Sequence, residues 1–204
     1  MSKQFADVVE ARLPELKQLV FSRPVPEDAV VRAKELMDRA IADAPDDPSG
    51  IFARYMRARA MEDGILSVES MDSVLEDYRY VMNHGADLRS EGMISYARLL
   101  YWRNEQANAA EALSLCAEAA RLDSNPRAMM LAGYISDHAM HDMELAASWY
   151  LRAFRSGLPW GLRFYATVQF KRRKYLVAAG AHLAATLASP FLVLRHGKSD
   201  PFRL

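Results

Sequence analysis

The sequence predicts an all-α protein in which antiparallel helical hairpins stack into a short right-handed α-solenoid. A four-position pattern with offsets of 0, 4, 7 and 11 residues recurs every 34 to 41 residues. Small and larger residues at this spacing share one helix face, which lets neighbouring helices pack closely. No segment shows the sustained period-2 alternation typical of strands. The pattern occurs at Ala33, Met37, Ala40 and Ala44, at Val74, Tyr78, Val81 and Gly85, at Ala112, Cys116, Ala119 and Asp123, and at Ala146, Tyr150, Ala153 and Gly157.

Helix start and stop residues fall where such an array needs them. Asp47-Pro48 and Asn125-Pro126 each place a capping side chain before a proline that suits the first helical turn. Pro159 is expected to open a helix in the same way, and Gly85 and Gly157 suit helix C-termini.

The helices expected from these residues divide the chain into three parts. These are an N-terminal helical segment at 1–26, a repeat array at 27–194 and a basic C-terminal tail at 195–204. The expected helices span residues 3–21 (with a break at Pro14), 27–44, 48–62, 68–84, 88–104, 107–122, 126–139, 142–156, 159–172 and 174–189.

One stretch carries a family resemblance. Its residues are Ala128, Leu131, Ala132, Gly133 and Tyr134 in one helix and Ala146, Trp149, Tyr150, Ala153 and Gly157 in the next. It resembles tetratricopeptide-like repeats and, more narrowly, their SEL-one-like subclass. The preceding unit, Tyr96 to Asp123, is similar to an ordinary tetratricopeptide unit. The likeness covers residues 88–170 and is weaker over 27–85, where the spacing stretches and Val replaces Ala.

The resemblance implies that the first helices of the hairpins line a concave surface that captures a peptide, a helix or a folded partner. The preferred function is therefore a non-enzymatic scaffold or adaptor that needs no cofactor and binds no nucleic acid. The positions expected to be exposed on this surface and to contact the partner are Arg54, Arg57, Tyr101, Asn104, Glu105, Ser136, Asp137 and Gln169.

Two features of this surface allow more than one interpretation. Arg54 and Arg57 share a helix face, where they could clamp a carboxylate or acidic peptide. The alternative is a solvated face whose arginines pair with nearby Asp or Glu. Tyr101 and Trp102 are adjacent and point in different directions, so one is expected in the core and the other as an exposed anchor.

The net charge of zero is the sum of two parts of the chain that carry opposite charges. Residues 151–204 hold ten Lys/Arg and one acid, a net charge of +9, so residues 1–150 carry −9. This split favours an anionic partner or surface at the C-terminal end. The alternative is that the two ends attract each other.

The last apolar segment, residues 175–194, contains no Asp, Glu, Lys or Arg. Three interpretations stay open: a buried terminal helix, an interface for a partner or a second copy, and contact with a membrane. Array spacing at Leu176, Gly180, Leu183 and Leu187 favours the first. Pro190 is expected to end the helix, so that 191–194 can fold back as a cover. The cluster proposed for an anionic or membrane surface is Lys171, Arg172, Arg173 and Lys174.

Sequence motifs for chemistry are missing. There is no phosphate-binding glycine loop and no nucleophile elbow. Asp137-His138 and His141-Asp142 come nearest to a metal cluster, but they lie at an expected turn, where such residues cap helices. Cys116 occupies a packing position and is expected to be inert.

The expected compartment is the cytoplasm. Cys116 is the only cysteine, and the N-terminal sequence lacks the features of a secretory signal. The competing function is a membrane-associated assembly or regulatory factor that docks on the inner membrane through residues 171–198.

Overall fold

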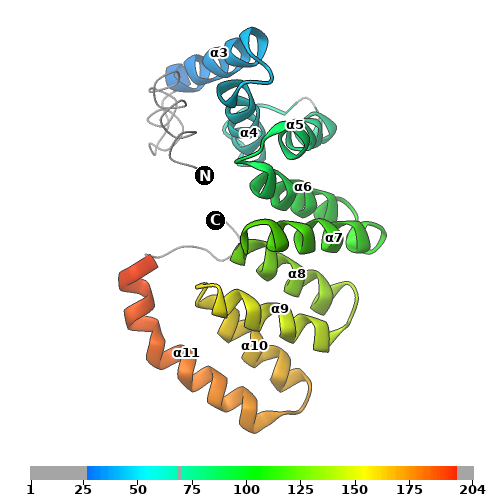
Figure 1. Cartoon of the computed structure of the whole chain (residues 1–204), viewed down its shortest axis with the longest axis vertical. Coiled ribbons are helices and arrows are strands. Elements are labelled where there is room, and N and C mark those ends of the chain that lie inside the picture. Colours follow the sequence, from blue (N-terminus) through cyan, green and yellow to red (C-terminus); the bar gives the residue numbers. More distant parts are fainter. Residues whose placement is uncertain (1–26, 69, 197–204) are drawn as a thin grey trace. The chain divides into compact units, whose positions relative to one another are not determined.

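The computed structural model describes residues 27–68 and 70–196, and in this part the protein is all-α (Figure 1). The fold class predicted from the sequence is therefore confirmed. The helix expected at 3–21 and the end of the tail lie outside the described residues. The helices are α3 (Glu27–Asp43), α4 (Pro48–Glu62), α5 (Met71–His84), α6 (Arg89–Arg103), α7 (Glu105–Asp123), α8 (Pro126–His138), α9 (Met143–Arg155), α10 (Trp160–Lys171) and α11 (Tyr175–His196).

Local capping explains why most of these boundaries were predicted to within a few residues. The Asn125 side chain accepts a hydrogen bond from the Arg127 N–H at 3.0 Å, and Pro126 occupies the first turn of α8. Pro48 opens α4 in the same way, although the Asp47 side chain makes no capping hydrogen bond.

The chain forms two compact units, Met1–Tyr96 and Ala97–Leu204, and the division falls within α6. In the first unit α3 packs on α4 and α4 on α5, around a core that includes Met37, Phe52 and Met56. In the second unit α7 packs on α8, α8 on α9, α9 on α10 and α10 on α11. Each unit is thus a run of hairpins whose contacts join neighbours in sequence, as in a solenoid.

The repeated pattern marks the packing face of the second helix of each hairpin. Its first three positions are fully buried at Val74, Tyr78 and Val81, at Ala112, Cys116 and Ala119, and at Ala146, Tyr150 and Ala153. Gly133 of α8 makes room for the larger residue of its hairpin, because a β-carbon there would lie 2.7 Å from the Tyr150 ring. Tyr150 is buried, which confirms its expected packing role, and its neighbour Trp149 is buried as well.

Two first helices begin with backbone packed directly on backbone. A β-carbon at Gly50 would lie 2.0 Å from the Ala44 carbonyl oxygen, and one at Gly161 would lie 2.4 Å from the Tyr150 carbonyl oxygen. Each glycine comes two residues after a proline, Pro48 or Pro159. Only glycine fits such an approach.

The last helix differs from the prediction at its C-terminal end. α11 continues through Pro190 to His196, so residues 191–194 belong to the helix and do not fold back. A proline inside a helix removes one backbone hydrogen bond at a cost of about 3 kcal/mol. Here the segment before the proline, residues 175–189, is rich in the strong helix formers Ala and Leu and favours continuation.

The register of α11 also differs from the prediction. Leu176, Leu183 and Leu187 are exposed, and nothing lies within 4 Å of a β-carbon placed at Gly180. The side turned to α10 carries Ala178 and Ala185 instead, and both are buried. The prediction of a buried terminal packing face at these positions is therefore wrong. Among the described residues, no helix has the length and apolar character needed to cross a membrane.

Candidate partner-binding surface

The strongest candidate surface lies in the second unit, where the C-terminal ends of α6 and α8 bring four ring side chains together. We call Tyr101, Trp102, Tyr134 and His138 the aromatic strip. The Tyr101 and Trp102 ring centroids are 5.2 Å apart, and those of Trp102 and Tyr134 are 5.6 Å apart. Tyr134 stacks on His138 with centroids 4.0 Å apart. Rings in these geometries attract one another beyond their burial, so the strip is a preformed surface.

One of the two adjacent aromatic residues of α6 is buried and the other is exposed, as predicted. Tyr101 is fully buried, whereas Trp102 is 50% exposed. Successive helical residues point about 100° apart, and here only Tyr101 points into the core. Trp102 is thus an exposed aromatic supported from behind by Tyr101 and Tyr134.

Acidic side chains give the strip its electrostatic character. Burial, followed by the charge of Glu105, raises the pKa of Tyr101 to about 12. Burial also raises the pKa of Tyr134, and Glu105 and Asp137 add to that shift. Both hydroxyls stay protonated at neutral pH, and Glu105 is an acidic side chain that lies close to both rings.

Asp137 and Lys171 form an ion pair beside the strip. Lys171 Nζ donates to Asp137 Oδ2 at 2.6 Å, and the Asp137 side chain is only 6% exposed. Their spacing of 34 residues places them at equivalent positions in successive first helices. Lys171 is therefore held by the protein's own carboxylate.

The other three residues of the predicted basic cluster differ in whether they form an ion pair. Arg172 pairs with Glu144 of α9. Arg173 and Lys174 are exposed and form no ion pair within residues 27–68 and 70–196. Two of the four cations thus stabilise the unit, and two are presented to the surroundings.

In the first unit, Arg54 and Arg57 bind carboxylates of their own chain. Arg57 donates from Nε to Asp77 Oδ2 and from Nη2 to Asp77 Oδ1, both at 2.8 Å, and from Nη1 to Asp38 Oδ1 at 3.1 Å. Arg54 Nη1 donates to Asp77 Oδ1 at 3.2 Å, and its guanidinium lies 4.1 Å from the Tyr80 ring centroid. This is the arrangement expected of the paired-arginine alternative. Partner binding at these two arginines stays a prediction.

Several other residues assigned to the surface are not exposed. The expectation of exposure is wrong for Tyr101, Ser136, Asp137 and Gln169, which are all buried. The Ser136 hydroxyl donates to the Ala132 carbonyl oxygen at 2.8 Å. For Ser136, Asp137 and Gln169, the physical reason is that α8 and α10 each pack on two neighbouring helices, so little of their surface stays open.

Asn104 and Glu105 are exposed, but Asn104 has a structural role. Its side chain accepts a hydrogen bond from the Ala107 N–H at 3.1 Å and thereby caps α7. Glu105 occupies the first turn of the same helix, where an acid complements the helix dipole.

The residues considered for metal or nucleophilic chemistry also have structural roles. Asp142 caps α9 by accepting from the N–H groups of Glu144 and Leu145. No group of three metal-ligating side chains occurs among the described residues. Cys116 is fully buried, and burial raises the pKa of its thiol, which disfavours the reactive thiolate.

Sequence reasoning missed Tyr134 and His138 as surface residues. A Tyr-x-x-x-His pair occurs twice in the chain, and both pairs stack: Tyr80 on His84 with ring centroids 4.1 Å apart, and Tyr134 on His138. That repeated spacing of four was the signal available in the sequence. Comparison with models of known protein families and with curated proteins gave no match.

Proposed function

We propose that the protein is a non-enzymatic scaffold or adaptor of the tetratricopeptide-like kind, which holds a segment of another protein against the aromatic strip. The observation that carries this proposal is Trp102, a large aromatic that is half exposed yet supported by two other rings. Tryptophan and tyrosine dominate the binding energy of protein interfaces.

The chemistry of the strip indicates which segment fits it. The exposed side of Trp102 favours apolar side chains and cations, and Glu105 adds negative charge. The segment held there is expected to carry Lys or Arg beside an apolar residue. We further propose a cytoplasmic location, supported by the one cysteine, which is unpaired and buried.

A capture experiment with matched variants tests the proposal. The full-length protein, W102A and L122A are immobilised and exposed to extract from the native host, and each captured protein is quantified. Leu122 is a comparably exposed apolar residue on α7 and serves as the control. A partner of the strip is expected to be captured by wild type and L122A and to fall at least about tenfold with W102A. Equal capture by W102A and wild type would count against the strip.

A further inference from the structure

The exposed side of α11 has an unusual composition for a protein surface. Leu176 is 91% exposed, Leu183 61% and Leu187 66%, and Val177 is also exposed. Gly180 lies among them with open space around it. We call these five residues the outer face. Contiguous apolar surface of this kind marks a place where something else binds.

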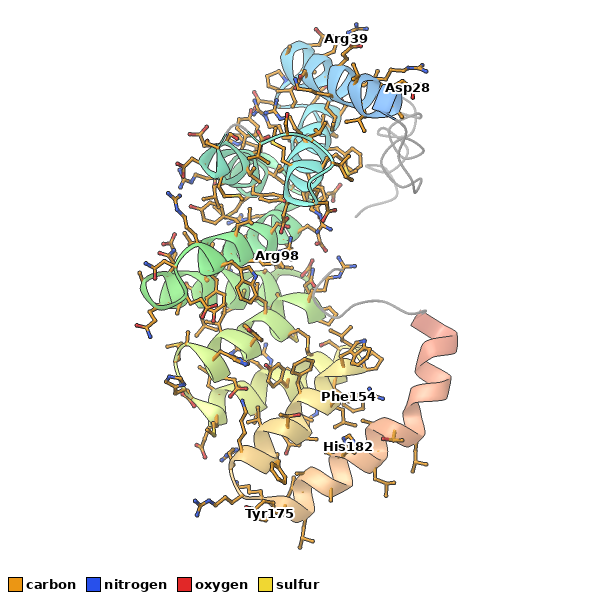
Figure 2. The ribbon with its side chains drawn as sticks, turned by 180° about the vertical axis from the view of Figure 1, so that it is seen from behind. Asp28, Arg39, Arg98, Phe154, Tyr175 and His182 are labelled. Atoms are coloured by element: carbon orange, nitrogen blue, oxygen red, sulfur yellow. The ribbon has the colours of Figure 1, made fainter. Side chains whose placement is uncertain are left out.

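No residue of the outer face has a polar side chain. Tyr175 and His182, both labelled on α11 in Figure 2, line an apolar groove of about 500 Å³ between α10 and α11, together with residues that include Phe170. The Thr186 hydroxyl donates to the His182 carbonyl oxygen at 2.9 Å. The five side chains of the outer face carry no hydrogen-bonding group, so they can enter an apolar medium without losing a hydrogen bond to water.

Aromatic and basic side chains stand at the N-terminal end of the outer face. Phe170 is 63% exposed and lies with its ring centroid 5.3 Å from that of Tyr175, which is also exposed. Arg173 and Lys174, next to them in sequence, are the exposed cations without an ion pair described above. Aromatic rings beside Lys and Arg are the typical composition at the boundary between lipid headgroups and acyl chains.

Charge decides which occupant fits the outer face. Pairing two copies through α11 in parallel would bring Arg173 and Lys174 against the same residues of the second copy. An antiparallel pairing would bring them towards Arg195 of the second copy, which follows the apolar segment. Like charges meet in both cases, which disfavours the pairing of two copies through α11. An anionic surface complements the same charges.

We propose that the outer face of α11 docks peripherally on an anionic lipid membrane. The leucines enter the boundary between headgroups and acyl chains, and Arg173 and Lys174 contact the headgroups. The opposite side of α11 packs on α10 through Ala178 and Ala185, so the helix lies along the membrane surface while the hairpins stay in water. This inference is independent of the aromatic strip.

Vesicle flotation of the full-length protein tests the docking. Vesicles of pure phosphatidylcholine are compared with vesicles containing about one third phosphatidylserine at about 0.15 M salt. Wild type is expected to float with the anionic vesicles only, and to be released as salt rises. Failure of wild type to bind the anionic vesicles would overturn the proposal.

Two pairs of substitutions separate the apolar from the charged contribution. L183Q/L187Q is expected to lower binding about 100-fold, since each leucine contributes about tenfold on entering the membrane. R173Q/K174Q is expected to lower it about 25-fold, since each cation contributes about fivefold. The controls are L122Q and R121Q/R155Q, which change exposed residues on α7 and α9 and should bind like wild type.

A dye attached at one position of the outer face distinguishes docking on lipid from pairing with a second copy. Cys116 is buried, so a polarity-sensitive thiol dye labels L183C selectively, and L122C provides the matched control. The dye at 183 is expected to shift to the blue with anionic vesicles, and the dye at 122 is not. A dimer in sedimentation that L183Q/L187Q abolishes, together with an unchanged dye at 183 on vesicles, would assign the face to a second copy and refute lipid docking.

Discussion

In the first unit, the buried carboxylate of Asp77 holds two arginine side chains in place. Its carboxylate accepts three hydrogen bonds from Arg54 and Arg57, and its side chain is only 4% exposed. The hydrogen bond to Asp77 is the main reason that the pKa of Arg57 is raised. The pKa of Asp38 is lowered, because hydrogen bonds from Lys34 and Arg57 outweigh its partial burial.

Replacing Asp77 therefore tests this ion-pair network. D77N keeps the shape of the side chain but leaves two partly buried guanidinium groups without their shared counter-charge. We expect the free energy of unfolding to fall by about 3 kcal/mol, as for other broken buried pairs. Urea denaturation measures it. E76Q, an exposed change on the same helix, should stay within about 0.5 kcal/mol of wild type. A D77N variant as stable as E76Q would refute the network's role.

Alanine substitutions at two helical glycines should change the stability of the protein in opposite directions. G133A would place a β-carbon 2.7 Å from the Tyr150 ring, whereas G180A meets nothing within 4 Å. G133A is expected to destabilise by about 1–3 kcal/mol through overpacking. G180A should stabilise by up to about 1 kcal/mol through helix propensity. Thermal unfolding of both variants measures the contrast, and a shift of the same sign in both would contradict it.

At the scale of helices, caps explain where α7, α8 and α9 begin. Each starts after an Asn or Asp whose side chain accepts from a backbone N–H of the first turn. A cap of this kind contributes about 1 kcal/mol. Asn104 is the informative case, because the sequence predicted a contact with a partner at this position.

Substitution of Asn104 distinguishes the two roles. N104A is expected to lower the free energy of unfolding by about 1 kcal/mol, and N104D should retain nearly all of it, because aspartate caps as well. Chemical denaturation gives both values, with Q106A as a nearby exposed control. If N104A matches Q106A in stability, the cap contributes nothing, and the predicted contact becomes the better account of Asn104.

At the scale of the whole molecule, we expect a substitution in one compact unit to leave the stability of the other unchanged. The contacts of Asp77 all lie in the first unit, and those of Gly133 lie in the second. Distant sites without shared partners usually act independently. In hydrogen exchange, D77N is therefore expected to speed exchange in α4 and α5 and leave α8 and α9 unchanged. Equal acceleration in both units would show that the chain unfolds as one body.

Most of the fold could be predicted because its signals are local. Pro48, Asn125 and Gly157 mark helix ends within a few residues of sequence, independently of what packs nearby. The end of α11 could not be predicted in this way, because the cost of one proline competes with the helix preference of a long Ala- and Leu-rich segment.

The candidate surface was predicted less well than the helices, since exposure depends on neighbours that are distant in sequence. Periodicity identifies a helix face but not what covers it, so Ser136 and Gln169 were assigned to the wrong environment. The same spacing is buried at Tyr150 and exposed at Leu183, because α11 turns its alanines towards α10. Only the packed structure separates these cases.

The absence of a side chain at Gly50 and Gly161 limits how this protein can diverge. Both contacts are made by backbone atoms, Gly50 with Ala44 and Gly161 with Tyr150, so they do not depend on which side chains surround them. A larger residue would push α4 away from the connection that precedes it, or α10 away from α9. Any variant that keeps the fold must therefore retain glycine at these two positions, whatever side chains change around them.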